Sequence, residues 1–283
     1  MEYSSKLIIE VCSLDQSGIN LPFWFVKKHY VDITSNHFII SNDGNYILHY
    51  QFTEQCTSIQ LMNKLNNKAI VWVTSQKHLP EWERSFPFRQ IFHHYFEHSD
   101  YCLIHGAGVG INDHGIILTA KGGSGKSTAA LACLSNGWQY IGDDFILVNI
   151  KTKYMYSLYN VAKLEKHQLD IFSKFRTLVT PQSLSLQKKQ MFLYPHYKQV
   201  LCQKMQIKAI VTPEYDQALA TSRLESSSVA KTLLAMAPST MFLLKSDNQL
   251  FLKISELCRS FSPYKLKTMS NIDSIPIVLK ELL

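Results

Sequence analysis

The strongest constraint on the fold is a short glycine-rich segment that follows an apolar strand and precedes an apolar helix. Residues 120–127 read AKGGSGKS, which departs from the pattern G-x-x-x-x-G-K-[ST] at one position, because Ala120 replaces the first glycine. The preceding residues, GIILTA, predict a strand, and the following residues, STAALACL, predict a helix. A glycine turn in this setting directs backbone N–H groups at an anion, beside the positive end of the helix dipole. The segment therefore favours an α/β fold with a phosphate-binding loop.

We call residues 120–125 the glycine loop and expect it to bind the phosphates of a nucleotide such as ATP. Lys126 is expected to contact only the β- and γ-phosphates, and the Ser127 hydroxyl to bind a Mg²⁺ ion that bridges them. Ala120 cannot easily take a positive φ, so the entry to the loop is expected to differ slightly from the standard conformation. The alternative is a glycine-rich turn without a ligand. The predicted nucleotide-binding residues are Gly122, Gly123, Ser124, Gly125, Lys126, Ser127 and Thr128.

Two adjacent acids end the next predicted strand, whose sequence is WQYIGDD. Functional side chains of an α/β sheet gather at the carboxyl ends of its strands, so Asp143 and Asp144 are candidates for the reacting centre. One carboxylate could orient and deprotonate an acceptor hydroxyl while the other holds Mg²⁺. Because neighbouring residues of a strand point to opposite faces, both can serve only if the strand ends there. The alternative is one functional Asp beside a turn or capping residue.

A second glycine run, GAGVG at residues 106–110, lies upstream of the glycine loop. Its spacing differs from that of a dinucleotide-binding fingerprint, and residues 112–115, NDHG, predict a turn where that fold needs a helix. We therefore expect these glycines to allow close backbone packing.

The order His105-Gly106, GGSGKST at 122–128 and Gly142-Asp143-Asp144 resembles the HPr kinase/phosphorylase family, most clearly over residues 100–150. The resemblance implies a P-loop kinase core akin to that of ATP-dependent phosphoenolpyruvate carboxykinase. It also implies that His105 lies beside the reacting phosphate, that Asp143 is the general base and that Asp144 helps to bind metal. On the residues alone, His105 follows the apolar CLI and could equally be a buried core histidine.

Two departures from that family affect the metal site and the substrate. The family has a further metal-contacting acid downstream, and between residues 151 and 208 only Glu165 and Asp170 could supply it. Glu165, in VAKLEKHQL, is the preferred ligand. No segment matches the one with which the family grips HPr, so the resemblance does not imply HPr as the substrate. The chain also looks like shortened members that include the tailoring kinases of lasso-peptide clusters, which implies the C-terminal Ser of a precursor peptide as acceptor.

Positive charge is concentrated downstream of the glycine loop. Residues 151–208 contain eleven Lys or Arg and two acids, so this segment carries +9, whereas the whole chain carries +7. One interpretation is a field that attracts nucleotide and an acidic peptide; the other is an ordinary solvated surface. Nucleic acid is a weaker option, because no recognisable nucleic-acid-binding motif accompanies the charge. The candidates to neutralise phosphoryl charge are Lys163, Lys188 and Lys189.

The positions of the cysteines and of the apolar residues argue against several other classes of protein. The six cysteines lie far apart without a C-x-x-C pair, which favours a reducing cytoplasm over a disulfide scaffold or zinc site. The first residues do not resemble a secretory signal, and no stretch is long and apolar enough for a membrane-spanning helix. We expect a cytoplasmic protein with no membrane partner.

The chain divides, on its sequence pattern, into a mostly β accessory region at 1–86 and a kinase-like catalytic domain at 87–283. In the first region, HFIIS and NYILHYQF predict a hairpin around residues 42–44. Helices are predicted at residues 88–98, 126–136, 226–236, 247–260 and 273–283.

These patterns lead to one hypothesis and two alternatives. The hypothesis is an ATP- and Mg²⁺-dependent kinase that phosphorylates a serine hydroxyl of a peptide or protein, with Lys126, Asp143 and His105 as catalytic residues and with Ser127, Asp144 and Glu165 at the metal. The alternatives are a kinase of a small hydroxyl compound such as free serine, and a nucleotide-gated regulatory module without turnover. The sequence leaves open ATP against GTP, reverse phosphorolysis and a homo-oligomeric state.

Overall fold

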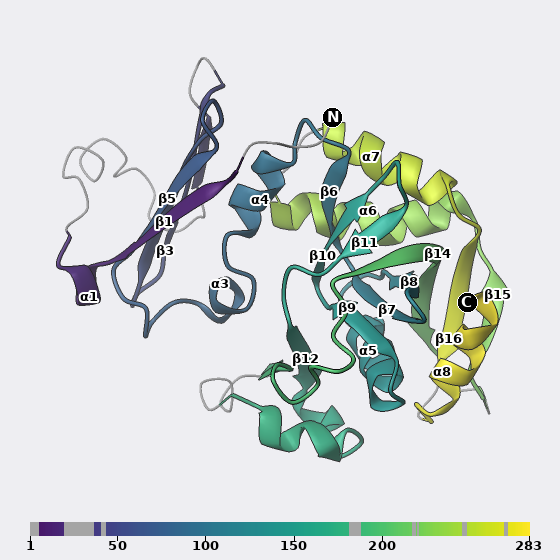
Figure 1. Cartoon of the computed structure of the whole chain (residues 1–283). Coiled ribbons are helices and arrows are strands. Elements are labelled where there is room, and N and C mark those ends of the chain that lie inside the picture. Colours follow the sequence, from purple (N-terminus) through teal and green to yellow (C-terminus); the bar gives the residue numbers. More distant parts are fainter. Residues whose placement is uncertain are drawn as a thin grey trace. The chain divides into compact units, whose positions relative to one another are not determined.

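The computed structural model describes residues 6–19, 37–40, 44–180, 188–216, 219, 221–244, 248–268 and 271–283 (Figure 1). Contacts within the chain divide it into an N-terminal unit, Met1–His98, and a C-terminal unit, Ser99–Leu283. The predicted boundary at residue 86 lies before helix α4 (Arg89–Tyr95), whereas the observed division follows this helix. The physical reason is that Ile91 of α4 packs in the hydrophobic cluster of the N-terminal unit, with Ile47 and Met62.

The N-terminal unit is mostly β. Its five strands lie in the order β1-β5-β4-β3-β2, with β1 and β5 parallel and the other pairs antiparallel. The predicted hairpin is present as the antiparallel pair β2 and β3, while turn residues 42 and 43 lie outside the described residues. The strands are β1 (Ile8–Ser13), β2 (His37–Ile40), β3 (Tyr46–Phe52), β4 (Thr57–Asn63) and β5 (Lys68–Val73). The described part of this unit also contains helices α1 (Leu14–Ser17) and α3 (Glu81–Ser85).

The C-terminal unit is a mixed α/β structure built on a nine-stranded sheet. Seven strands follow the order β6-β10-β11-β14-β8-β7-β9, and the long strand β14 also pairs with β16, which pairs with β15. The strands are β6 (Tyr101–His105), β7 (Ala107–Ile111), β8 (His114–Leu118), β9 (Gln139–Gly142), β10 (Phe145–Asn149), β11 (Tyr154–Tyr156), β14 (Lys204–Tyr215), β15 (Arg223–Ser226) and β16 (Pro263–Thr268).

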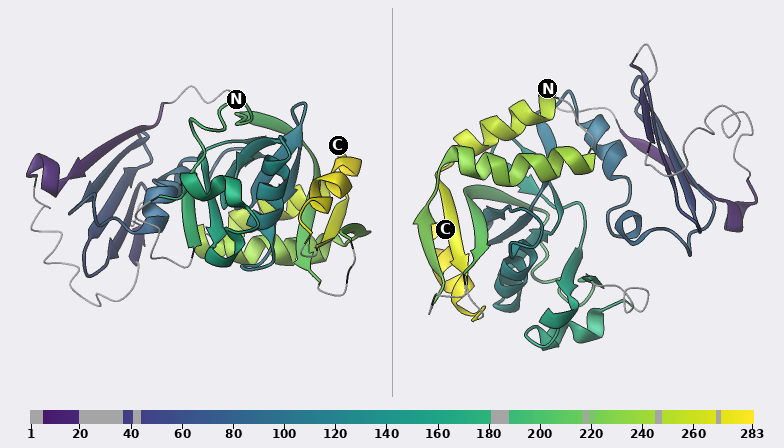
Figure 2. Two further views of the ribbon diagram at one scale, coloured as in Figure 1. Left: turned by 90° about the horizontal axis from the view of Figure 1, so that it is seen from below. Right: turned by 180° about the vertical axis from the view of Figure 1, so that it is seen from behind.

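Helices cover both faces of this sheet, with α5 (Lys126–Ser135) and α8 (Ser274–Leu279) on one side (Figures 1 and 2). Helices α6 (Val229–Leu244) and α7 (Asn248–Arg259) lie on the other side. The predicted helix 226–236 is too short, because α6 continues past Pro238 and still buries Thr240 and Leu244. The 3-10 turn η4 (Lys280–Leu282) follows α8. Within the described ranges, no helix has the length and apolar character needed to cross a bilayer.

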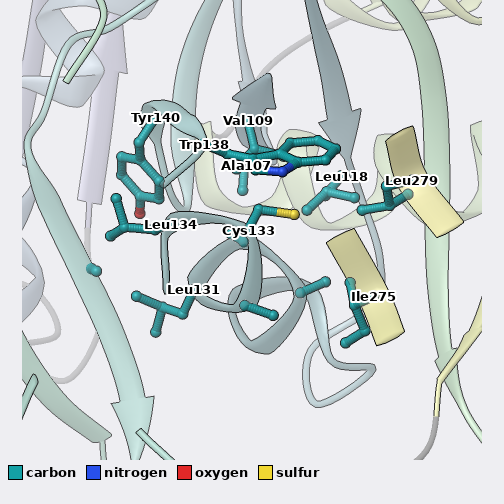
Figure 3. Packing of buried hydrophobic residues seen from close by; sticks show 14 of the residues in the cluster. Ala107, Val109, Leu118, Leu131, Cys133, Leu134, Trp138, Tyr140, Ile275 and Leu279 are labelled. Atoms are coloured by element: carbon teal, nitrogen blue, oxygen red, sulfur yellow. The ribbon is translucent and has the colours of Figure 1, made fainter. Parts of the chain in front are cut away.

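Helix α5 is held against the sheet by a continuous apolar core (Figure 3). Leu131 and Leu134 of the helix are buried in the same cluster as Val109 and Leu118 of strands β7 and β8. Fully burying a side chain of this size contributes about 1.5–3 kcal/mol, so the cluster fixes the helix firmly. The segment that enters α5 is thereby fixed beside the end of β8.

A separate two-stranded sheet flanks α5. Its antiparallel strands are β12 (Val161–Glu165) and β13 (Lys188–Phe192), and the sequence analysis predicted neither. Two 3-10 turns follow β12, namely η1 (Lys166–Gln168) and η2 (Ser173–Leu178). Ala162, Leu164 and Met191 belong to the core, because alternate residues of a strand share one face. The opposite side, which we call the polar face, carries Lys163, Glu165, Lys188 and the buried Gln190, and at its far end Val161 and Phe192.

Candidate functional site

The glycine loop connects the end of β8 to the start of α5, as predicted. Gly123 and Gly125 have φ values of 81° and 94°, a conformation that favours glycine. A Cβ atom built on either residue, or on Gly122, would meet no heavy atom within 4 Å. Glycine is thus required at 123 and 125 by the backbone conformation, and the space beside the loop is open. Ala120 is buried and keeps a negative φ, so the first position of the pattern does not need glycine here.

Helix α5 begins at Lys126 and has Gly125 as its N-cap, so no side chain caps its first turn. The first backbone N–H groups of a helix have no partner within the helix and are suited to bind an anion. Ser127 and Thr128 lie in this first turn, and the N–H of Ser124 donates to the carbonyl of Lys121 at 3.3 Å within the loop. The predicted nucleotide-binding residues therefore form one continuous segment around an uncapped helix end.

Asp143 and Asp144 both reach Lys126. The Lys126 Nζ atom lies 2.5 Å from Oδ1 of Asp143 and 2.9 Å from Oδ1 of Asp144. Two neighbouring residues can do this because β9 ends at Gly142 and Asp144 adopts a left-handed conformation with a φ of 66°. The condition set by strand alternation, that the strand must end before the acids, is met.

Two further groups hold Asp144. Its Oδ2 atom lies 3.1 Å from Nζ of Lys163, and its Oδ1 atom lies 3.3 Å from Nε2 of His105. Burial raises the pKa of Asp144, but Lys126, His105 and Lys163 outweigh it and hold this pKa well below its ordinary value. Burial likewise lowers the pKa of Lys126, but Asp143 and Asp144 outweigh it and raise this pKa above its ordinary value. The four charged side chains, Lys126, Asp143, Asp144 and Lys163, form what we call the loop cluster.

Asp143 has one engaged and one unengaged carboxylate oxygen. Oδ1 accepts one hydrogen bond from the ammonium group of Lys126 and another, at 2.8 Å, from the backbone N–H of Asp144. Oδ2 is buried, and no group in the described part of the chain hydrogen-bonds to it. An unpaired buried carboxylate oxygen is unfavourable unless a proton, a cation or a ligand satisfies it. Among the carboxylate oxygens of Asp143 and Asp144, this atom is therefore the one left to accept a proton or a metal.

The backbone of His105 is fixed by a residue that the sequence analysis missed. Its N–H donates to Oγ1 of Thr240 at 2.9 Å, and the Thr240 hydroxyl donates to the carbonyl of Met236 at 2.8 Å. Thr240 is fully buried in α6, far from His105 in the sequence, and no short-range pattern connects the two. On the imidazole ring, Nδ1 is buried and has no hydrogen-bond partner among the described residues.

The acids proposed for a downstream metal contact have other partners. The side chain and backbone of Glu165 form a capping box with Gln168 at the start of η1, and Oε1 of Glu165 lies 3.7 Å from Nζ of Lys188. Asp170 is exposed and pairs with Arg176. In the ranges that the structure covers, no three His, Cys, Asp or Glu side chains are grouped as metal ligands. A metal site at Ser127, Asp144 and Glu165 stays a prediction.

Two lysines predicted as equivalent differ in surroundings. Lys188 lies on the polar face with 58% of its side chain exposed, whereas Lys189 lies on the opposite side of β13 and is only 3% exposed. The adjacent β12 also contacts the site through η1, because Nε2 of Gln168 donates to Oγ1 of Thr128 at 2.8 Å. Gln168 was not among the predicted site residues.

The upstream glycine run packs closely, as expected. A Cβ atom on Gly108 would lie 2.8 Å from Sδ of Met155 and 2.9 Å from Cβ of Ile141, and residues 107–111 form strand β7. Asn112 and Asp113 form the turn between β7 and β8. These glycines serve the packing of the sheet.

Comparison with known proteins gives little further information. No family model matches the chain, and no curated protein matches it. Among solved structures, the chain is similar to the Hpr(Ser) kinase/phosphatase from Coxiella burnetii, with 12% identity over 64% of this chain and 92% of that one. The TM-score is 0.33, which is too low to carry an argument about fold or function.

Proposed function

We propose that this protein is an ATP- and Mg²⁺-dependent kinase that transfers the γ-phosphoryl group to a serine hydroxyl of a peptide or protein. The observation that supports it best is the loop cluster at the uncapped start of α5, in which Lys126 lies between Asp143 and Asp144. Open space beside the glycines of the loop leaves room for phosphates. In this proposal, phosphate oxygens replace the two carboxylates as the partners of Lys126.

The charges of the site fit a nucleotide that arrives with a cation. Two lysines and two aspartates balance in the loop cluster, so bound triphosphate would leave an excess of negative charge. A Mg²⁺ ion would offset this charge, with Ser127, Asp144 and Glu165 as its proposed ligands. Asp144 would have to exchange Lys163 for the ion, because both of its oxygens have cationic neighbours.

Asp143 is the proposed general base. As the bond from the serine Oγ to the γ-phosphorus forms and the bond to the β–γ bridging oxygen breaks, Oδ2 of Asp143 takes the hydroxyl proton. Lys126 and the N–H groups of the first turn of α5 stabilise the charge on the transferring group and on the ADP that leaves. His105 would lie beside the reacting phosphate, with its backbone fixed by Thr240.

The peptide acceptor is the finer part of the proposal. It is supported by the +9 charge of residues 151–208 and by the exposed position of Lys188 on the polar face. A precursor peptide of the lasso type that ends in serine is one such acceptor, and it is suggested by the sequence resemblance alone.

The test is a transfer assay with γ-labelled ATP, Mg²⁺ and a peptide that contains a single serine. We expect label on the peptide with the parent protein and at least about 100-fold slower labelling with Asp143→Asn. Transfer to free serine but to no peptide would replace the proposal by a small-molecule kinase. Nucleotide binding without transfer to any acceptor would replace it by a regulatory module.

A further inference from the structure

The polar face of β12 and β13 is attached to the loop cluster at two points. At the first, Lys163 extends from the polar face to Oδ2 of Asp144 at 3.1 Å. At the second, Gln168, at the end of η1, donates to Thr128 in the first turn of α5. The same Gln168 accepts the backbone N–H of Glu165 at 3.2 Å, which fixes η1 to the end of β12. The polar face is therefore a fixed wall beside the proposed phosphate site.

The polar side chains of this wall form two rows across the strands. Lys163 lies opposite Gln190, which is only 2% exposed, in the row that touches Asp144, so Lys163 alone represents this row at the surface. Glu165 lies opposite Lys188, in the next row. Successive rows on one face of a strand are two residues, or about 7 Å, apart. The second row carries the most exposed cation of the wall, because the Lys188 side chain is 58% exposed and that of Lys163 only 18%.

We propose that an acceptor peptide lies extended along the polar face, and that Lys188 selects an acidic residue two positions from the acceptor serine. This inference rests on the proposed function and adds the sequence preference of the acceptor. In this proposal the serine lies beside Asp143, and we place it at the level of the first row because Lys163 of that row contacts the adjacent Asp144. An extended peptide presents every second side chain on the same side, so the residue two positions away reaches the second row.

The charges of the second row favour a single carboxylate over a run of phosphates. Lys188 is paired only loosely with Glu165, at 3.7 Å, and can turn to a peptide carboxylate. A nucleic acid strand would bring several phosphates to a row whose one cation, Lys188, already has Glu165 as a neighbour, so most of that negative charge would lack a partner there. Lys189 does not contribute to this surface, because it is buried on the other side of β13.

The first experiment uses the parent protein and five matched peptides with one serine each. The peptides carry Glu two residues before the serine, two residues after it, one residue before it, one residue after it, or nowhere, with Ala in its place. We expect KM to be about fivefold lower for one of the two peptides with Glu at a distance of two, since an exposed ion pair contributes up to about 1 kcal/mol. The peptides with Glu adjacent to the serine should match the Ala peptide, because their carboxylate points away from the wall.

The second experiment reverses the charges. Lys188→Glu should lose the preference for Glu and should prefer a peptide with Lys at the same position by a similar factor. Lys208→Glu is the matched control, because Lys208 is exposed on β14 in the same basic segment and donates to Gln206, outside the polar face and the loop cluster. It should keep the preference of the parent protein.

Each outcome bears on the inference separately from the proposed function. Transfer to all five peptides with equal KM overturns the inference and leaves the kinase in place, whereas no transfer to any peptide contradicts both. An oligonucleotide that competes with the peptide more strongly than a Glu-rich peptide does would also overturn it. The peptide series uses only the parent protein, so it tests the proposed sequence preference even if Lys188→Glu fails to fold.

Discussion

The loop cluster and a second group of charges on β14 and β16 contain the same chemical groups in different surroundings. In the second group, which we call the edge cluster, Glu214 pairs with Lys265 at 2.7 Å and with Lys267, and Lys267 lies 3.7 Å from Asp216. Almost half of the Glu214 side chain is exposed, whereas the side chain of Asp143 is almost completely buried. Exposed pairs cost little to form and contribute little.

The two clusters differ in what it costs the folded protein to hold their charges. Burying charges costs several kcal/mol for each ion before the pairing energy offsets it, so a buried cluster is weak evidence for stabilisation. The loop cluster also retains one buried carboxylate oxygen without a hydrogen-bond partner among the described residues. We infer that the loop cluster serves to bind a ligand and that the edge cluster is an ordinary network of surface ion pairs.

The largest effect is expected from Lys126→Ala. Phosphoryl transfer should fall below detection, because the transferring group would lose the cation proposed to stabilise its charge. From the sequence, Lys126 was expected to contact only phosphates, so that its loss would leave the fold intact. The structure pairs it with Asp143 and Asp144, and removing one partner of a buried ion pair costs about 3–5 kcal/mol. Urea unfolding and the transfer assay measure the two effects. A variant with normal turnover would remove the phosphate-site assignment.

The second largest effect separates the two acids. Asp143→Asn should change the affinity for a fluorescent ATP analogue by no more than a few-fold. It should reduce turnover about 100-fold or more, as expected for a general base. Asp144→Asn should weaken nucleotide binding in the presence of Mg²⁺. Equilibrium titration and initial rates measure both. If Asp143→Asn weakens binding and Asp144→Asn does not, the two acids exchange roles.

The pH and salt dependence of stability gives a smaller effect. Because the pKa of Asp144 is lower in the folded than in the unfolded state, its contribution is present above the ordinary value of 3.8 and is lost as the pH falls through the folded pKa. The free-energy difference between the parent and Asp144→Asn should therefore be constant from about pH 5 upward and shrink only in more acidic solution. At neutral pH it should change little between about 0.05 M and about 1 M salt, since buried pairs are weakly screened. A difference that vanishes at high salt would place Asp144 in an exposed pair.

The smallest effect is expected in the edge cluster. The pKa of Glu214 is lowered to about 2, first through its hydrogen bonds to Lys265 and Lys267, but the group is too exposed for this to stabilise the fold strongly. Lys267→Ala should change the free energy of unfolding by no more than about 1 kcal/mol, and less in high salt. Transfer activity should equal that of the parent protein. A loss of phosphoryl transfer would show that the edge cluster also has a role in activity.

The parts of the site that adjacent residues create could be predicted from the sequence. The strand, glycine loop and helix at 114–135 follow from local patterns, and so does the position of the Asp pair at the end of β9. The opposite surroundings of Lys188 and Lys189 also follow from strand alternation, once β13 is recognised. It was missed because its residues, KKQMF, give no strand pattern before pairing with β12.

The contacts that complete the site depend on distant segments. Thr240 reaches His105 only because α6 extends past Pro238, which local rules treat as a helix end. Gln168 reaches Thr128 only because η1 turns back towards α5 after β12. Both contacts depend on tertiary packing, so neither can be predicted from helix or strand propensity.

The most direct test of the central claim is mass spectrometry of a single-serine peptide after incubation with ATP, Mg²⁺ and one of three proteins: the parent, Asp143→Asn or Lys267→Ala. We predict that the peptide gains the mass of one phosphoryl group, located on the serine. The rate should be equal for the parent and Lys267→Ala, and at least about 100-fold lower for Asp143→Asn. Equal phosphorylation by the parent and Asp143→Asn would contradict the account, because the buried cluster would then not differ in function from the exposed one.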